Sequence, residues 1–200
     1  MRYLALGDSY SIGEGVQEAE RWPMLLAARL RRAGVPLDDP LIVARTGWTT
    51  DELAASMDTA MLAPPYDLVT LLIGVNNQYR GRDLDNYRDE FRDLLARAVR
   101  LAGGNAGRVI VVSIPDWGVT PFARNDARGA ARIGQQVDAF NGVNREEAAR
   151  VGADWVDVAP LSRQPGEDWL VADELHPSAR QYTYWVDRIE PIATRMLGAG

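Results

Sequence analysis

The sequence of 200 residues predicts an α/β fold, a three-layer α/β/α sandwich around a five-stranded parallel sheet. Short apolar runs alternate along the chain with longer stretches of helical periodicity. The most apolar run, residues 68–73 (LVTLLI), does not alternate with polar residues, which is typical of a strand buried on both faces. No repeat, linker or low-complexity tract divides the chain, so we expect one domain over residues 1–200.

The first part of the chain supplies two strands and two helices ahead of that central run. The strands are expected at residues 3–6 and 41–44 (LIVA), and the helices at residues 22–32 and 49–60. A glycine and a proline follow the first helix and end it. Thr49 or Thr50 is expected to cap the second helix, because acidic residues occupy its first turn.

The second part continues the same alternation. A long helix is expected at residues 83–101, a strand within residues 108–114, and a helical stretch over about residues 125–150 with room for a break near Gly142. A short strand at residues 155–158, an irregular segment and a last helix complete the chain. Strands that alternate with helices in this way predict a parallel sheet covered by helices on both faces.

The composition excludes several kinds of chemistry. The chain has no Cys and no Lys, which removes thiolate metal sites, a Cys nucleophile, Schiff-base chemistry and a phosphate-loop lysine. With a single His, a metal site with several imidazole ligands is impossible. The net charge of −6 disfavours binding to nucleic acid and to anionic membranes.

No targeting segment is visible at the start of the chain, which reaches Gly7-Asp8-Ser9 almost at once. No run of about 18 apolar residues is present, so no membrane insertion is expected. These features favour a cytoplasmic protein, although the trimmed mature form of a secreted protein would look the same. The sequence does not indicate an oligomeric state.

The unusual residues of the chain follow the expected strands. Gly7-Asp8-Ser9 follows the first strand, Gly47 the second, Gly74-Val75-Asn76 the third, and Pro115 to Gly118 the fourth. Asp173 and His176 come after the fifth strand. Because ligand sites in parallel sheets form at the carboxyl ends of the strands, these loops are expected to converge on one site.

The residue types at these strand ends suit nucleophilic catalysis. An alcohol such as Ser9 needs a base to take its proton, and an imidazole such as His176 does this near neutral pH. Asp173, three residues earlier, is placed to orient the ring. The backbone N–H groups of Ser9 and Gly47 and the side-chain amide of Asn76 are candidate donors for an oxyanion hole.

At these residues the chain resembles the SGNH hydrolases, also called GDSL-type esterases and lipases. Their first block resembles residues 7–15 (GDSYSIGEG), their third falls on residues 74–77 (GVNN), and their last falls on residues 173–176 (DELH). The resemblance implies the flavodoxin-like SGNH hydrolase fold, Ser9 as nucleophile, His176 as base, and Gly47 with Asn76 in the oxyanion hole. It implies no metal and no cofactor. Asn77 stands where the family usually has Asp, so we expect altered loop hydrogen bonds rather than lost activity.

Each of these residues also has an ordinary structural interpretation. A lone Ser in a Gly-rich turn is more often a turn residue, Asn76 and Asp173 could be caps, and Asp8 is expected to organise its loop. Residues beside the motif loops are candidates for lining the substrate pocket, with core packing as the alternative: Trp48, Tyr79 and Trp117. The joint arrangement favours the catalytic interpretation over the separate ordinary ones.

The predicted function is therefore hydrolysis of a small or medium acyl ester through an acyl-Ser9 intermediate. The substrate classes left open are acetylated sugars, short-chain esters, thioesters and lysophospholipids, and transfer of the acyl group to another alcohol is not distinguished from hydrolysis. The alternative is a phosphate-, nucleotide- or sugar-binding module without turnover, since a Gly-rich turn at a helix start can bind phosphate. That alternative leaves Gly47, Asn76 and His176 unexplained.

Overall fold

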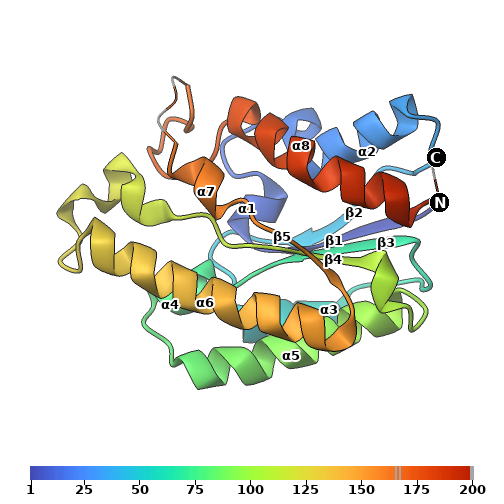
Figure 1. Cartoon of the computed structure of the whole chain (residues 1–200), viewed down its shortest axis with the longest axis horizontal. Helices are drawn as coiled ribbons and strands as arrows, with labels where there is room; N and C mark the ends of the chain where they lie inside the picture. The colour runs from blue at the N-terminus through green and yellow to red at the C-terminus, as the bar shows by residue number, and fades with distance from the viewer. Residues whose placement is uncertain (165, 167, 199–200) are drawn as a thin grey trace.

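The computed structural model describes residues 1–164, 166 and 168–198, and it contains a parallel sheet with the strand order β2-β1-β3-β4-β5 (Figure 1). The strands are β1 (Tyr3–Gly7), β2 (Leu41–Ala44), β3 (Leu68–Leu72), β4 (Val109–Val112) and β5 (Asp154–Val156). This is the flavodoxin-like order. The chain passes from β1 outward to β2 and then returns to β3 on the other side of β1, so the direction of winding reverses between β1 and β3.

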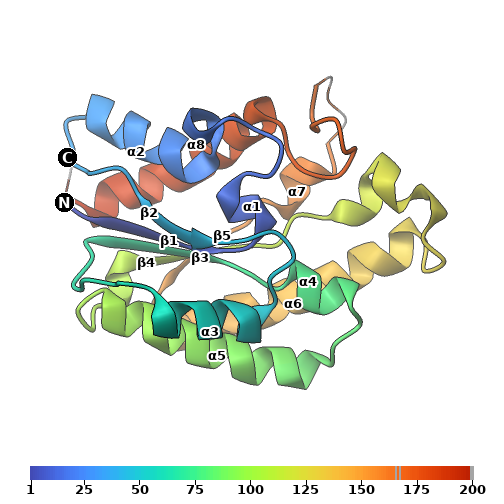
Figure 2. The same cartoon turned by 180° about the vertical axis from the view of Figure 1, so that it is seen from behind.

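Helices cover both faces of the sheet, which gives the three layers seen in Figures 1 and 2. One layer contains α1 (Ser9–Ile12), α2 (Trp22–Arg32), α7 (Ala159–Ser162) and α8 (Ala179–Met196). The opposite layer contains α3 (Thr50–Thr59), α4 (Val75–Tyr79), α5 (Leu84–Leu101) and α6 (Ala130–Val151). The described residues also form four short 3₁₀ helices, at Glu18–Glu20, Ala106–Arg108, Trp117–Val119 and Pro121–Asn125.

The central strands are buried on both faces because helices pack against each of them. Every residue of β1, β3 and β4 is buried, as the unbroken apolar runs predict. Trp185 of α8 lies in the core on one side, and Phe91 of α5 lies in the core on the other. A sheet packed in this way holds the ends of β1 and β3 rigidly, and the candidate site lies at those ends.

The long helical stretch differs from its expected form in two ways. Helix α6 begins only at Ala130, because residues 121–125 form a separate 3₁₀ helix and Gly129 has a positive φ of 73°. The helix also runs through Gly142 without a break. A helical glycine costs only about 1 kcal/mol, and its neighbours anchor the helix: Asn141 forms two hydrogen bonds with the backbone of Ile114, and Val143 is buried in the core.

Three short α-helices of the described chain had no counterpart among the sequence-based expectations: α1, α4 and α7. Each has only four or five residues, which is too short for a helical hydrophobic period to appear. Two of them carry candidate site residues, because α1 begins at Ser9 and α4 contains Asn76. Within the described part of the chain, no helix combines the length and apolar character needed to cross a membrane.

Candidate active site

Ser9 lies at the first turn of α1, directly after β1. The preceding Asp8 is the N-cap of this helix, and its Oδ1 accepts a hydrogen bond of 3.0 Å from the backbone N–H of Tyr10. Gly7 lets the turn pass close to β3, because a Cβ there would lie 2.5 Å from the carbonyl oxygen of Leu72. The tight turn therefore fixes Ser9 at the switch point between β1 and β3.

Asp8 is completely buried beside Ser9, and its second carboxyl oxygen has no hydrogen-bond partner among the described residues. Burial raises the pKa of Asp8 to about 7, while the hydrogen bond from Tyr10 lowers it in part. This carboxyl therefore changes its charge near neutral pH, next to the expected nucleophile. The sequence indicated its role as a loop organiser, and the helix cap agrees with that role.

Asp173 holds His176 through both its side chain and its backbone. Its Oδ2 lies 2.6 Å from the ring Nδ1, and its Oδ1 accepts hydrogen bonds of 2.9 Å from the backbone N–H groups of Leu175 and His176. Partial burial raises the pKa of Asp173, but these hydrogen bonds outweigh it and the net pKa is lowered. With Nδ1 occupied by a carboxylate, Nε2 is the ring nitrogen left to exchange a proton.

The three expected oxyanion donors come from three different segments: α1, the loop after β2, and α4. Asn76 donates a hydrogen bond of 2.9 Å from Nδ2 to the carbonyl of Trp48, which ties α4 to the loop after β2. Its amide has a second N–H that remains available. The backbone N–H groups of Ser9 and Gly47 have no protein acceptor within the described residues. Such unused donors are what a developing oxyanion requires.

Two side chains hold the loop that carries Gly47. Arg80 donates a hydrogen bond of 2.7 Å from Nη2 to the carbonyl of Gly47, whose positive φ of 88° turns the backbone at this point. Asn77 is fully buried and binds Thr50 twice, accepting from its backbone N–H at 3.1 Å and donating to its hydroxyl at 2.6 Å. No pattern in the sequence indicated this contact between Arg80 and Gly47.

The hydrogen bonds of Asn77 give a physical reason for the amide at this position. Thr50 donates its hydroxyl proton to Glu90, so its oxygen is left to accept a hydrogen bond from the residue at position 77. An amide can donate that bond, whereas an ionised carboxylate cannot.

These segments enclose a cavity of about 180 Å³ between the ends of β1, β2 and β3. Ser9, Gly47, Asn76 and His176 all line it. Asp173 does not line it but contacts His176, which does. The rest of its wall is mainly apolar: Tyr10, Thr46, Val75, Tyr79, Trp117, Phe122 and Leu175.

The three aromatic residues expected at the pocket have different positions. Tyr79 and Trp117 line the cavity, where their rings meet edge to face at 5.4 Å, and Trp117 donates a hydrogen bond of 2.7 Å to Gln78. Trp48 does not line the cavity; its side chain packs against the hydrophobic core, and only its carbonyl contacts a site residue, Asn76.

Sequence reasoning missed several residues of the wall. Leu175 lies between Asp173 and His176 in the last block, so its position beside the site could have been inferred. Phe122 comes from the 3₁₀ helix after β4, and no sequence pattern singled out this residue. No cluster of three or more acidic or imidazole side chains suited to a metal ion occurs in the described part of the chain.

The fold and the site together define the class of serine hydrolases with a flavodoxin-like sheet. The family model described as the GDSL-like lipase/acylhydrolase family matches residues 5–184, so the chain belongs to this family and is an ester hydrolase. The family name contains the letters G-D-S-L, whereas this chain has Tyr10 in the place of the leucine.

Solved structures with the same fold cover nearly the whole chain. The crystal structure of TesA has a TM-score of 0.75 at 18% identity, covering 98% of this chain and 99% of the other. The psychrotrophic esterase EstA from Pseudoalteromonas, in a structure inhibited by monoethylphosphonate, has a TM-score of 0.74 at 16% identity and covers 98% of each chain. The acetylxylan esterase Axe2 from Geobacillus stearothermophilus has a TM-score of 0.70 at 18% identity, covering 98% and 94%. Among curated protein sequences, no significant match was found.

Proposed function

We propose that this protein hydrolyses esters of short acyl groups through a covalent acyl-Ser9 intermediate, with His176 as general base and Asp173 as the group that orients it. The single observation that carries the proposal is the position of Ser9 and His176 in one cavity, with the imidazole Nδ1 held 2.6 Å from Asp173. The N–H groups of Ser9, Gly47 and Asn76 would bind the oxyanion of the tetrahedral intermediate.

In this mechanism each residue has one task. Ser9 Oγ attacks the ester carbonyl while His176 Nε2 takes its proton, and the protonated ring then gives that proton to the leaving alcohol. The carboxylate of Asp173 stabilises the charged ring during both steps. Water then attacks the acyl group while His176 takes its proton, and the ring returns that proton to Ser9 Oγ as the acid leaves.

The size and lining of the cavity support a short acyl group. Its volume is about 180 Å³, and part of that space must hold the reacting carbonyl and the leaving oxygen. The side chains of Val75, Phe122 and Leu175 offer apolar contact but no charged partner. Among relatives of the same fold, one is named as an acetylxylan esterase, which agrees with a small acyl group.

Labelling with a fluorophosphonate probe tests the nucleophile directly, because such probes phosphonylate activated serines. We expect a single adduct on Ser9 by mass spectrometry, lost in His176→Ala and in Ser9→Ala. Labelling of another serine, or labelling that survives in Ser9→Ala, would show that the assignment is wrong. A series of para-nitrophenyl esters then tests acyl size, with acetate and butyrate expected to be hydrolysed faster than octanoate and decanoate.

A further inference from the structure

A second cavity lies against the first and is more than three times as large. Its volume is about 600 Å³, compared with about 180 Å³ for the cavity that contains Ser9. Tyr10, Trp117 and Leu175 line both cavities, so they form a shared wall. The ring centroid of Tyr10 is 5.5 Å from that of His176. The side chain of Tyr10 therefore contacts both the second cavity and the candidate base.

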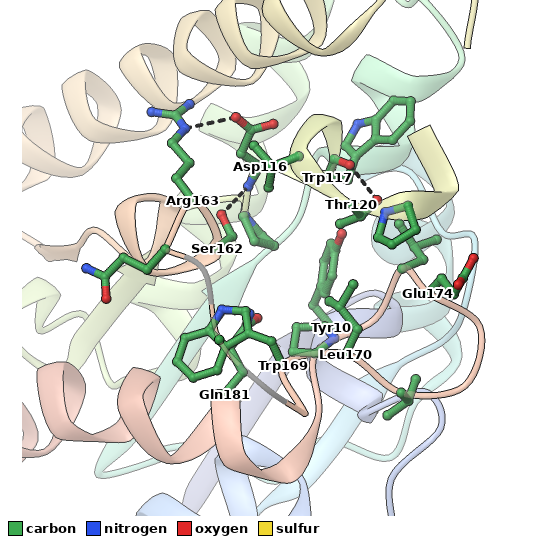
Figure 3. Close-up of a pocket in the computed structure, with 18 of the residues that line it drawn as sticks. Tyr10, Asp116, Trp117, Thr120, Ser162, Arg163, Trp169, Leu170, Glu174 and Gln181 are labelled. Carbon is green, nitrogen blue, oxygen red and sulfur yellow. Dashed lines mark hydrogen bonds and ion pairs between the residues drawn. The ribbon is translucent and has the colours of Figure 1, made fainter. Parts of the chain in front are cut away.

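Figure 3 shows how the walls of the second cavity are built. Tyr10 extends from one side toward the segment that carries Trp117 and Thr120, and the ion pair of Asp116 with Arg163 lies on another side. Trp169 and Gln181 also line the cavity. The indole of Trp169 is fixed by a hydrogen bond of 3.1 Å to the carbonyl of Leu161, so it offers a rigid aromatic surface.

Two polar side chains of this wall, Gln181 and Tyr10, are nearly completely buried. The side chain of Gln181 is only 1% exposed, and its Nε2 has no acceptor among the described residues. Tyr10 lines the same cavity and is only 2% exposed, but its hydroxyl is not among the fully buried polar atoms that lack a partner. A buried amide without a partner is costly, so an occupant that accepts its hydrogen bond would relieve that cost.

The charges on the wall disfavour an anionic occupant. Arg163 is the only basic residue among the described lining residues, and it is already paired with Asp116 at 2.8 Å and with Asp138 at 2.6 Å. Glu174 and Asp168 add two further carboxylates. A free carboxylate or phosphate would therefore meet net negative charge and no available cation.

An acyl chain is also a poor match for this cavity. A hydrocarbon chain would cover the amide of Gln181 and the hydroxyl of Tyr10 without offering either a hydrogen bond. The remaining class is a neutral molecule with many hydroxyl groups and an apolar face for an indole, and a saccharide has both features. A volume of about 600 Å³ also falls within the usual range for sites that enclose ligands of this size.

We propose that the second cavity binds the sugar part of the substrate, a mono- or disaccharide whose short acyl ester reaches Ser9 across the wall of Tyr10, Trp117 and Leu175. The proposal rests on the proposed function, because it assigns the alcohol of the ester to be hydrolysed. Gln181 and the Tyr10 hydroxyl would bind sugar hydroxyls, and Trp169 would pack against the sugar ring.

Binding can be measured apart from catalysis in the Ser9→Ala variant, which keeps both cavities but lacks the nucleophile. We expect calorimetry to detect xylobiose or cellobiose at millimolar concentration, and inorganic phosphate and decanoate not to compete. Gln181→Met preserves the shape of the side chain and removes its polar group, so it should weaken disaccharide binding about five- to tenfold. Trp169→Leu should weaken it as well, whereas Gln135→Met, on a side chain that lines neither cavity, should not.

The kinetic test compares two acetate esters with the same acyl group and different alcohols. With Ser9 present, Gln181→Met and Trp169→Leu should raise KM for monoacetylated xylobiose and leave the turnover of para-nitrophenyl acetate unchanged. Equal losses on both esters would indicate a general structural effect and would overturn the proposal. Absence of disaccharide binding by Ser9→Ala, or displacement of the disaccharide by phosphate or decanoate, would overturn it too.

The two proposals fail in different ways. If the wild-type protein hydrolyses neither ester while Ser9→Ala still binds the disaccharide through Gln181 and Trp169, the sugar site stands and the esterase mechanism does not. If para-nitrophenyl acetate is hydrolysed through Ser9 but no disaccharide binds, the esterase mechanism stands and the sugar site is refuted.

Discussion

Asp173 binds His176 at two points, with one carboxylate oxygen 2.6 Å from the ring Nδ1 and the other 2.9 Å from the backbone N–H of the same residue. The second oxygen also accepts the N–H of Leu175. One side chain thus shapes the turn that carries His176 and orients its ring. The two functions use different oxygens, so they can be separated by substitution.

Asp173→Asn should preserve the turn and change the tautomer of the His176 ring. The amide oxygen can still accept the two backbone N–H groups, but the amide nitrogen then faces Nδ1 as a donor and forces the ring proton onto Nε2. We expect kcat for para-nitrophenyl acetate to fall about a hundredfold or more, less than for His176→Ala. Because the chain has one His, NMR of its imidazole nitrogens reports the tautomer without overlap. Full activity together with an unchanged tautomer would contradict this role for Asp173.

The raised pKa of the buried Asp8 predicts that the stability of the protein depends on pH. Burial raises the pKa of Asp8 to about 7 in the folded protein, from 3.8 when the group is unperturbed. Between these values the folded state binds more protons than the unfolded state, so the free energy of unfolding falls as the pH rises through this window and levels off above it. The total effect is on the order of a few kcal/mol.

The measurement is chemical denaturation of the wild type and of Asp8→Asn at several pH values from about 4 to 8, which covers the range between the unfolded and folded pKa values of Asp8. Asp8→Asn keeps an acceptor for the N–H of Tyr10 and cannot ionise, so its stability should lose this pH dependence and exceed that of the wild type at the alkaline end. Asp93→Asn, at an exposed position on α5, should leave the dependence in place. Equal slopes in the wild type and Asp8→Asn would rule out Asp8 as the titrating group.

The order of the strands and long helices was predictable because each is marked by a strong local pattern. The unbroken apolar runs gave β1, β3 and β4, and the expected ends of the helix Trp22–Arg32 and of the strand Leu41–Ala44 agree with the structure. Elements of one turn were not predictable, since a single turn carries no period. They are stabilised by caps and neighbours, as at α1, where Asp8 caps the start.

The positions of the strand ends in the sequence predicted which residues meet at the cavity, but they did not predict the contacts between loops. Ser9, Gly47, Asn76 and His176 line one cavity because parallel strands end at one edge of the sheet. Arg80 holds the carbonyl of Gly47 across 33 positions of sequence, and only the packing of α4 against the loop after β2 brings them together. The second cavity depends on how separate loops and α8 pack around one another, which no local pattern in the chain encodes.

Asn77→Asp, which restores the residue more usual for the family, should destabilise this particular protein. The new carboxylate would face the hydroxyl oxygen of Thr50, whose proton is already donated to the carboxylate of Glu90. Two acceptors would then compete for one proton at a buried position, at a cost of about 1–3 kcal/mol in the free energy of unfolding. Adding Glu90→Gln supplies a donor and should recover most of the loss in a double-mutant cycle measured by denaturation. Additive losses in the double variant would show that the three side chains are not coupled.

Gly74 and Gly81 provide a matched pair for testing backbone constraint beside Asn76. Both have positive φ, 128° for Gly74 and 68° for Gly81, so alanine is strained at each by about 1–3 kcal/mol. Only at Gly74 would the added Cβ also meet a neighbour, since it would lie 2.6 Å from the ring of the buried Tyr87, while nothing lies within 4 Å at Gly81. Gly74→Ala should therefore lower the unfolding midpoint well beyond Gly81→Ala and reduce kcat by moving the start of α4 and the amide of Asn76. Similar losses of stability and of kcat in the two variants would mean that the conformation at Gly74, and not its contact with Tyr87, sets the position of Asn76.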